Sequence, residues 1–210
     1  MVRERRALVP FEIAAVLAIG IAWPFVSWSE LIPFSLPLYV AASIARSMRG
    51  RTWSEVAAGG LHYLALGALA GAAALGLSIV FGTRIVELLS NHAVEWSQFG
   101  FVRGSSTQLA VFAVWVAVAA VTAELALRGW IVERVLELAP GSPVLAVLTG
   151  AIAEALLVPG GVGVRIGAAV FGIGLGWIYL AGGRSVVAPT AARFVFSVGA
   201  LVLDGLQIIG

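Results

Sequence analysis

Four charged side chains interrupt apolar stretches of this 210-residue sequence, where ionised groups are costly to place. Glu124 and Arg128 lie four residues apart in VTAELALRGW, with the acid first, which is the better order for an ion pair on one helix. Glu154 and Arg193 lie in two later apolar segments. Two carboxylates could supply general acid–base chemistry, or both could be held by the arginines for structure alone.

The positions of Glu154 and Arg193 along their segments predict that they meet. At the rise of an α-helix, both lie roughly 14–17 Å from the same side of the membrane. The attraction between opposite charges offsets part of the cost of burying either one. We therefore expect an intramembrane salt bridge between them.

The composition indicates an integral membrane protein. Hydrophobic residues make up 60% of the chain and charged residues 11%, with a mean hydropathy of +1.02. Cysteine is absent, so disulfides and cysteine-ligated metals are excluded. His62 and His92 are isolated and show no metal-ligand spacing, and we expect neither a metal nor a cofactor. The arginines form no basic patch, which argues against nucleic-acid binding.

The apolar runs predict an all-α, polytopic bundle of about seven transmembrane helices, at 8–28, 30–45, 56–82, 107–127, 143–158, 164–182 and 185–208. Pro33 and Pro37 leave open a broken or re-entrant second segment. The helix that holds Glu124 is expected to continue to Glu137. Residues 84–101 read as an amphipathic helix on the outer surface, or alternatively as an ordinary connector.

The arginines set the expected orientation. A cytoplasmic N-terminus puts nine of them inside (3, 5, 6, 46, 49, 51, 128, 134 and 184) and three outside (84, 103 and 165). We therefore predict a multi-pass protein of the inner (cytoplasmic) membrane, with the C-terminus outside. The basic, apolar N-terminus reads as a retained first helix, because no clear cleavage site follows it.

Three stretches carry a family resemblance: AELALRG at 123–129, LTGAIAEAL at 148–156 and AAVFGIGLGWIYLAGGRSVVAPTAARFVFS at 168–197. They resemble the CPBP family, also called ABI, which includes the CAAX prenyl endopeptidases and bacteriocin-processing membrane proteins. The resemblance covers roughly residues 107–200. It implies one membrane domain with a CAAX-protease-like core at 107–210, preceded by N-terminal helices and the outer segment at 1–106.

The resemblance also implies which positions would do chemistry. Active members carry Glu-Glu-x-x-x-Arg, then Phe-x-x-x-His, then His-x-x-x-Asn, and are taken to activate a water for peptide hydrolysis. In this chain the corresponding residues are Ala123, Glu124, Arg128, Gly150, Glu154, Arg193 and Ser197. Both histidines are replaced by residues of opposite charge, so the motif is degenerate and no catalytic set is intact.

Three functions follow as alternatives. We favour a pseudo-enzyme that acts by binding, as a subunit or as an assembly or protective factor of a membrane protein complex, with the bilayer and an integral membrane protein as partners. The second is an active intramembrane endopeptidase with a rearranged site built on Glu154 and Glu124. The third, a transporter or channel, lacks the internal repeat that would support it.

Overall fold

All regular secondary structure in the described part of the chain is helical. The computed structural model describes residues 8–26, 32–90 and 105–205. Apolar runs form helices because a helix satisfies its own backbone hydrogen bonds where no water is available. The prediction of an all-α membrane bundle is confirmed.

Seven helices overlap the seven predicted segments, with shifted ends: α2 (Val9–Ala22), α3 (Ser35–Ser47), α5 (Leu61–Leu77), α7 (Ser106–Ala126), α9 (Pro143–Leu157), α10 (Val162–Ala181) and α11 (Val187–Gly205). The third predicted segment starts too early, because residues 58–60 are not helical and separate α5 from a short helix before it. Shorter elements join them: the 3-10 turn η1 (Trp23–Phe25), α4 (Ser54–Ala57), α6 (Thr83–Ser90), α8 (Glu133–Leu138) and the π-helices η3 (Ser78–Gly82) and η5 (Leu127–Val132). Among the described residues, four helical stretches are long and apolar enough to cross a membrane: Leu61–Gly82, Ser106–Leu138, Val162–Ala181 and Val187–Gly205. The full number of spans stays a prediction.

The two-proline segment is a continuous helix over α3. Pro33 precedes the helix, and Pro37 lies in its first turn, where a missing N–H removes no helical hydrogen bond. Thirteen residues extend only about 20 Å, less than the hydrocarbon thickness of about 30 Å. The prolines therefore shorten this segment without breaking the helix.

Two other helix predictions have different outcomes: one is confirmed, and the other can be followed only over part of its length. The helix that holds Glu124 continues through η5 and α8 to Leu138, as expected. The proposed amphipathic segment is helical over α6, where Ile85 and Leu88 are exposed. Its remaining residues, 91–101, lie outside the described part of the chain.

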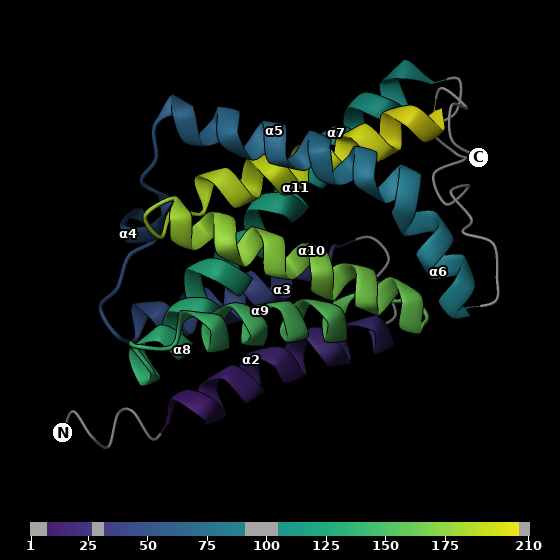
Figure 1. The fold of residues 1–210 in the computed structure, drawn as a ribbon. Coiled ribbons are helices and arrows are strands. Elements are labelled where there is room, and N and C mark those ends of the chain that lie inside the picture. The colour runs from purple at the N-terminus through teal and green to yellow at the C-terminus, as the bar shows by residue number, and fades with distance from the viewer. Residues whose placement is uncertain (1–7, 27–31, 91–104, 206–210) are drawn as a thin grey trace.

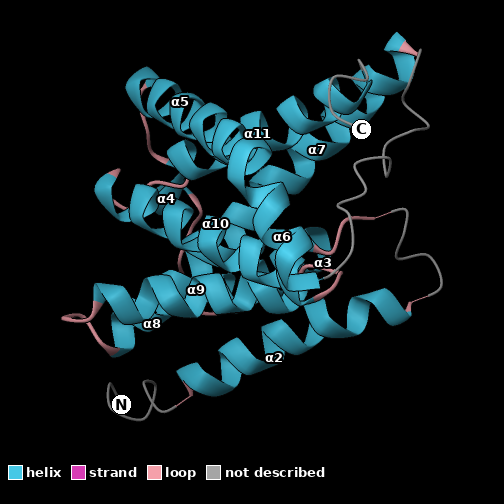
Figure 2. Cartoon of the chain, turned by 45° about the vertical axis from the view of Figure 1, so that its right-hand side comes forward, coloured by secondary structure: helices cyan, strands magenta, loops and turns pink. Residues whose placement is uncertain are grey.

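The long helices pack side by side in pairs (Figures 1 and 2). α5 packs along α11, α9 along α10, and α3 along α7, while α2 lies against α3 and α9. The main apolar core is formed by α2 and α3 together with α7, η5 and α9. Four of its residues are completely buried: Leu38, Leu127, Trp130 and Ile131. Both halves of the chain thus contribute to the packing around α7 and η5.

Glycine allows α5 and α11 to pack backbone against backbone. A Cβ added at Gly71 would lie 2.9 Å from the Cα of Ala192, and one added at Gly67 would lie 2.8 Å from the Cβ of Ala191. Small residues four apart favour close helix packing in membranes. This contact fixes α11, and with it Arg193, against the rest of the bundle.

We expect Gly71→Ala to destabilise the protein by on the order of 1–3 kcal/mol, because the new methyl group overpacks a backbone contact. Gly76→Ala, on the same helix with open space around the added Cβ, is the control, and the gain in helix propensity should make it neutral or slightly stabilising. Thermal unfolding in detergent measures both. Equal effects of the two substitutions would contradict the close packing of α5 on α11.

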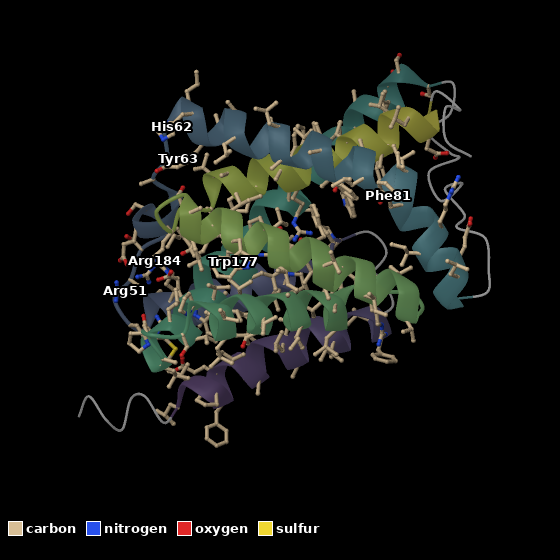
Figure 3. All side chains as sticks on the ribbon, in the orientation of Figure 1. Arg51, His62, Tyr63, Phe81, Trp177 and Arg184 are labelled. Carbon is tan, nitrogen blue, oxygen red and sulfur yellow. The ribbon has the colours of Figure 1, made fainter. Side chains whose placement is uncertain are left out.

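The orientation prediction can be tested with single cysteines, because the natural chain has none. Arg51 and Arg184 lie together at the end of the bundle where α4 is found, whereas Phe81 lies at the opposite end (Figure 3). Ser54 in α4 and Arg165 at the start of α10 are both exposed. We expect a membrane-impermeant maleimide added outside intact cells to label Arg165→Cys but not Ser54→Cys, and the reverse pattern would invert the assigned topology.

Candidate functional site

The four charges within the apolar segments form one closed ring of ion pairs. Arg193 donates from Nε to Oε1 of Glu124 at 2.5 Å and from Nη2 to Oε1 of Glu154 at 2.5 Å. Arg128 donates from Nη1 to Oε1 of Glu124 at 3.1 Å and from Nη2 to Oε2 of Glu154 at 2.7 Å. Each carboxylate therefore contacts both guanidinium groups. We call these four residues the charge ring.

Each member of the charge ring comes from a different helical element. α7 carries Glu124, η5 carries Arg128, α9 carries Glu154 and α11 carries Arg193. The two pairs expected from the sequence, Glu124 with Arg128 and Glu154 with Arg193, are both confirmed. The crossed pairs between them close the ring.

A fifth element, α10, completes the surroundings of Arg128. The Gly172 carbonyl accepts a second hydrogen bond from Nη2 of Arg128, at 2.8 Å. A Cβ at Gly172 would lie 2.9 Å from Oε2 of Glu154 and 3.0 Å from the Cα of Ala151. Only a residue without a side chain lets the backbone of α10 approach the ring this closely.

Burial separates Arg193 from the other members of the charge ring. The side chains of Glu124 and Arg128 are 0% exposed and that of Glu154 is 2% exposed, whereas that of Arg193 is 15% exposed. The Phe171 ring lies 5.6 Å from the guanidinium carbon of Arg193 and packs against Phe196. Aromatic faces attract guanidinium groups, so this pair covers the more open side of the ring.

The charges of the ring sum to zero, which matters in an apolar environment. Placing single ions there is expensive, and mutual attraction compensates only when geometry and hydrogen bonding are good. Two buried atoms of the charge ring nevertheless have no hydrogen-bond partner among the described residues: Oε2 of Glu124 and Nε of Arg128. Glu124 Oε2 is thus the one ring carboxylate oxygen that no guanidinium engages.

The remaining positions implied by the resemblance contribute nothing polar to the ring. Ala123 is buried in the apolar core. Ser197 is half-buried on α11, and none of the hydrogen bonds described for the four ring residues reaches its hydroxyl. Gly150 leaves space that the Val132 side chain approaches, at 2.9 Å from an added Cβ. Among the described residues, no group of three or more acidic or histidine side chains could hold a metal ion.

A second ionic cluster explains the GGRS sequence after α10. Gly183 and Arg184 both adopt a left-handed conformation with φ of 68°, which turns the chain back toward η5 and α8. Glu133 then accepts from the hydroxyl of Tyr179 at 2.7 Å and from Nε of Arg184 at 2.7 Å, with a further bond to Nη2. These hydrogen bonds hold the pKa of Arg184 above its ordinary value. The family resemblance included this stretch, but nothing in the sequence predicted its contact with Glu133.

Comparison with known proteins agrees with the resemblance. Residues 105–199 match a family model described as type II CAAX prenyl endopeptidase Rce1-like. The matched segment contains every member of the charge ring. Neither the curated proteins nor the solved structures gave a match.

Removing one charge from the ring should be worse than removing a balanced pair. We expect Glu154→Gln to destabilise the protein by about 3–5 kcal/mol, because it leaves a buried guanidinium uncompensated. Glu154→Gln combined with Arg193→Gln should recover part of that loss. Chemical unfolding in detergent measures each variant, with Glu87→Gln at an exposed position of α6 as a control that should change little. Additive losses would show that the two residues do not stabilise each other.

Proposed function

Because residues 105–199 form an Rce1-like segment, we propose that this protein is a catalytically degenerate relative of the CAAX/CPBP type that acts by binding. Its proposed role is that of a subunit, or of an assembly or protective factor, in a membrane protein complex of the inner membrane. The proposed partner is an integral membrane protein that it contacts within the bilayer.

One observation carries this proposal. Glu154 and Arg193, which stand where active members of the resembled family have histidines, are both held in ion pairs. Arg193 donates to both carboxylates of the ring, and a guanidinium stays protonated and cannot act as a base at neutral pH. Both oxygens of Glu154 already accept hydrogen bonds from guanidinium groups. A general base needs a lone pair directed at the water that it deprotonates. Arg193 therefore has no lone pair to offer, and both oxygens of Glu154 are directed at guanidinium groups, which supports a role in ion pairing.

One observation favours the alternative, an intramembrane endopeptidase with a rearranged site. Oε2 of Glu124 is buried and has no hydrogen-bond partner among the described residues. In that function Oε2 would take a proton from water as the water oxygen attacks the scissile carbonyl. Arg193 would stabilise the oxyanion, and the proton would pass to the leaving amine. Within this alternative Glu124, and not Glu154, is the better-placed base.

Two measurements on the protein purified in mild detergent separate the functions. We expect no hydrolysis of a prenylated CAAX peptide above the background of the Glu124→Gln variant, and we expect a membrane protein to co-purify in a fixed stoichiometry. The variant with Glu154→Gln and Arg193→Gln serves as the matched control, since a ring that keeps a net charge of zero should keep the partner. Hydrolysis that Glu124→Gln abolishes would favour the endopeptidase. Recovery of a lone monomer would contradict the subunit role.

A further inference from the structure

Helix α3 contacts the continuous helix formed by α7 and η5, which carries Glu124 and Arg128, at two places. Near the start of α3, the Ser35 hydroxyl accepts a hydrogen bond from Oγ1 of Thr122 at 2.8 Å. Near its end, Nη1 of Arg46 donates to the Gly129 carbonyl at 3.0 Å. Both bonds are buried, and the two contacted residues flank the ring pair on α7 and η5. α3 lies outside the segment that matches the Rce1-like family.

The Arg46 guanidinium is fixed by contacts on every side. Nε and Nη2 donate to the Thr52 carbonyl at 3.0 and 2.8 Å, and Nη2 also lies 3.3 Å from Oε2 of Glu55. The Trp53 ring lies 4.9 Å from its central carbon, and its indole N–H donates to the Ser43 hydroxyl at 3.1 Å. The side chain is only 4% exposed. The planar guanidinium group of arginine can donate to two carbonyls in fixed directions at once, which the ammonium group of lysine does not do.

The contact falls on the backbone of a π-helix. Gly129 belongs to η5, whose hydrogen bonds connect residues five apart and are less common than the four-residue bonds of an α-helix. A Cβ at Gly129 would lie 3.2 Å from the side chains of Trp53 and Val56, so the segment 52–56 packs directly on this turn. If η5 relaxed to α-helical geometry, each residue beyond the change would rotate by about 100°. Arg128 would then no longer be placed to donate hydrogen bonds to both Glu124 and Glu154.

The same segment also contacts the start of α11. The Val186 N–H donates to the Val56 carbonyl at 2.8 Å, and an added Cβ at Gly59 would lie 2.8 Å from Val187. α11 carries Arg193 two turns further on. Segment 52–56 therefore contacts η5 directly and contacts the residue just before α11; these two elements supply the arginines of the charge ring.

We propose that Arg46 and segment 52–56 form a clasp that positions the charge ring. Arg46 is a positioning residue: it holds η5 in its π-helical register, so that Arg128 can reach both Glu124 and Glu154. The clasp acts whether the ring is catalytic or silent. Its outer side is open, since the Arg51 side chain is 52% exposed and the Glu55 side chain 37%.

Hydrogen–deuterium exchange tests the clasp in the full-length protein. We expect Arg46→Met to accelerate amide exchange in residues 127–133 by roughly tenfold or more, because a buried charge-assisted hydrogen bond to the backbone is lost. Exchange in the α5–α11 contact should stay unchanged. Arg51→Met removes an arginine that shares the Glu55 partner but does not contact η5, and should leave residues 127–133 unaffected. A uniform acceleration in all helices, or equal effects of the two variants, would overturn the proposal.

A second measurement separates positioning from general packing. If Arg46 acts through Arg128, Arg46→Met should shift the unfolding midpoint far less in an Arg128→Met background than in the natural protein, whereas Arg51→Met should shift it equally in both. Additive shifts for Arg46 would overturn the proposal. Arg46→Lys keeps the positive charge but loses the planar guanidinium fork, and it serves if Arg46→Met does not fold. It should accelerate exchange at 127–133 to an intermediate degree, and natural exchange there would also overturn the proposal.

Discussion

Charge neutrality inside an apolar bundle is the constraint on which this structure depends. Glu124 and Glu154 each contact both Arg128 and Arg193, so no ring charge is left without an opposite neighbour. A buried ion pair contributes little net stability against apolar packing, yet breaking it is expensive. Helices α7, α9 and α11 must therefore converge at one point, and the ring specifies their arrangement more than it adds to stability.

The backbone adapts to that convergence in two ways. Glycine lets helices come close where the ring or its supports require it: Gly172 brings α10 against Glu154, and Gly71 brings α5 against α11. The helix of Glu124 also widens into the π-helix η5 directly beyond the acid. π-bulges inside helices occur frequently at functional sites. Here the widened turn presents Arg128 to the ring and the Gly129 carbonyl to Arg46.

The Rce1-like segment is held by elements outside it. All four ring residues lie in 105–199, but α3 contacts this segment at Thr122 and at Gly129. The proposed function and the proposed clasp thus concern different parts of the chain.

The sequence by itself determined the helical class, the continuation of the Glu124 helix as far as Glu137 and the pairing of Glu154 with Arg193. Hydropathy and a constant rise per residue fix which residues share a layer of the membrane. They do not fix the direction in which each side chain points around its helix. Only tertiary packing decided the crossed ion pairs, the hydrogen bond from Arg128 to the Gly172 carbonyl and the Arg46 clasp. These contacts depend on how each helix is rotated about its axis and on a π-helical turn that no spacing in the sequence predicts.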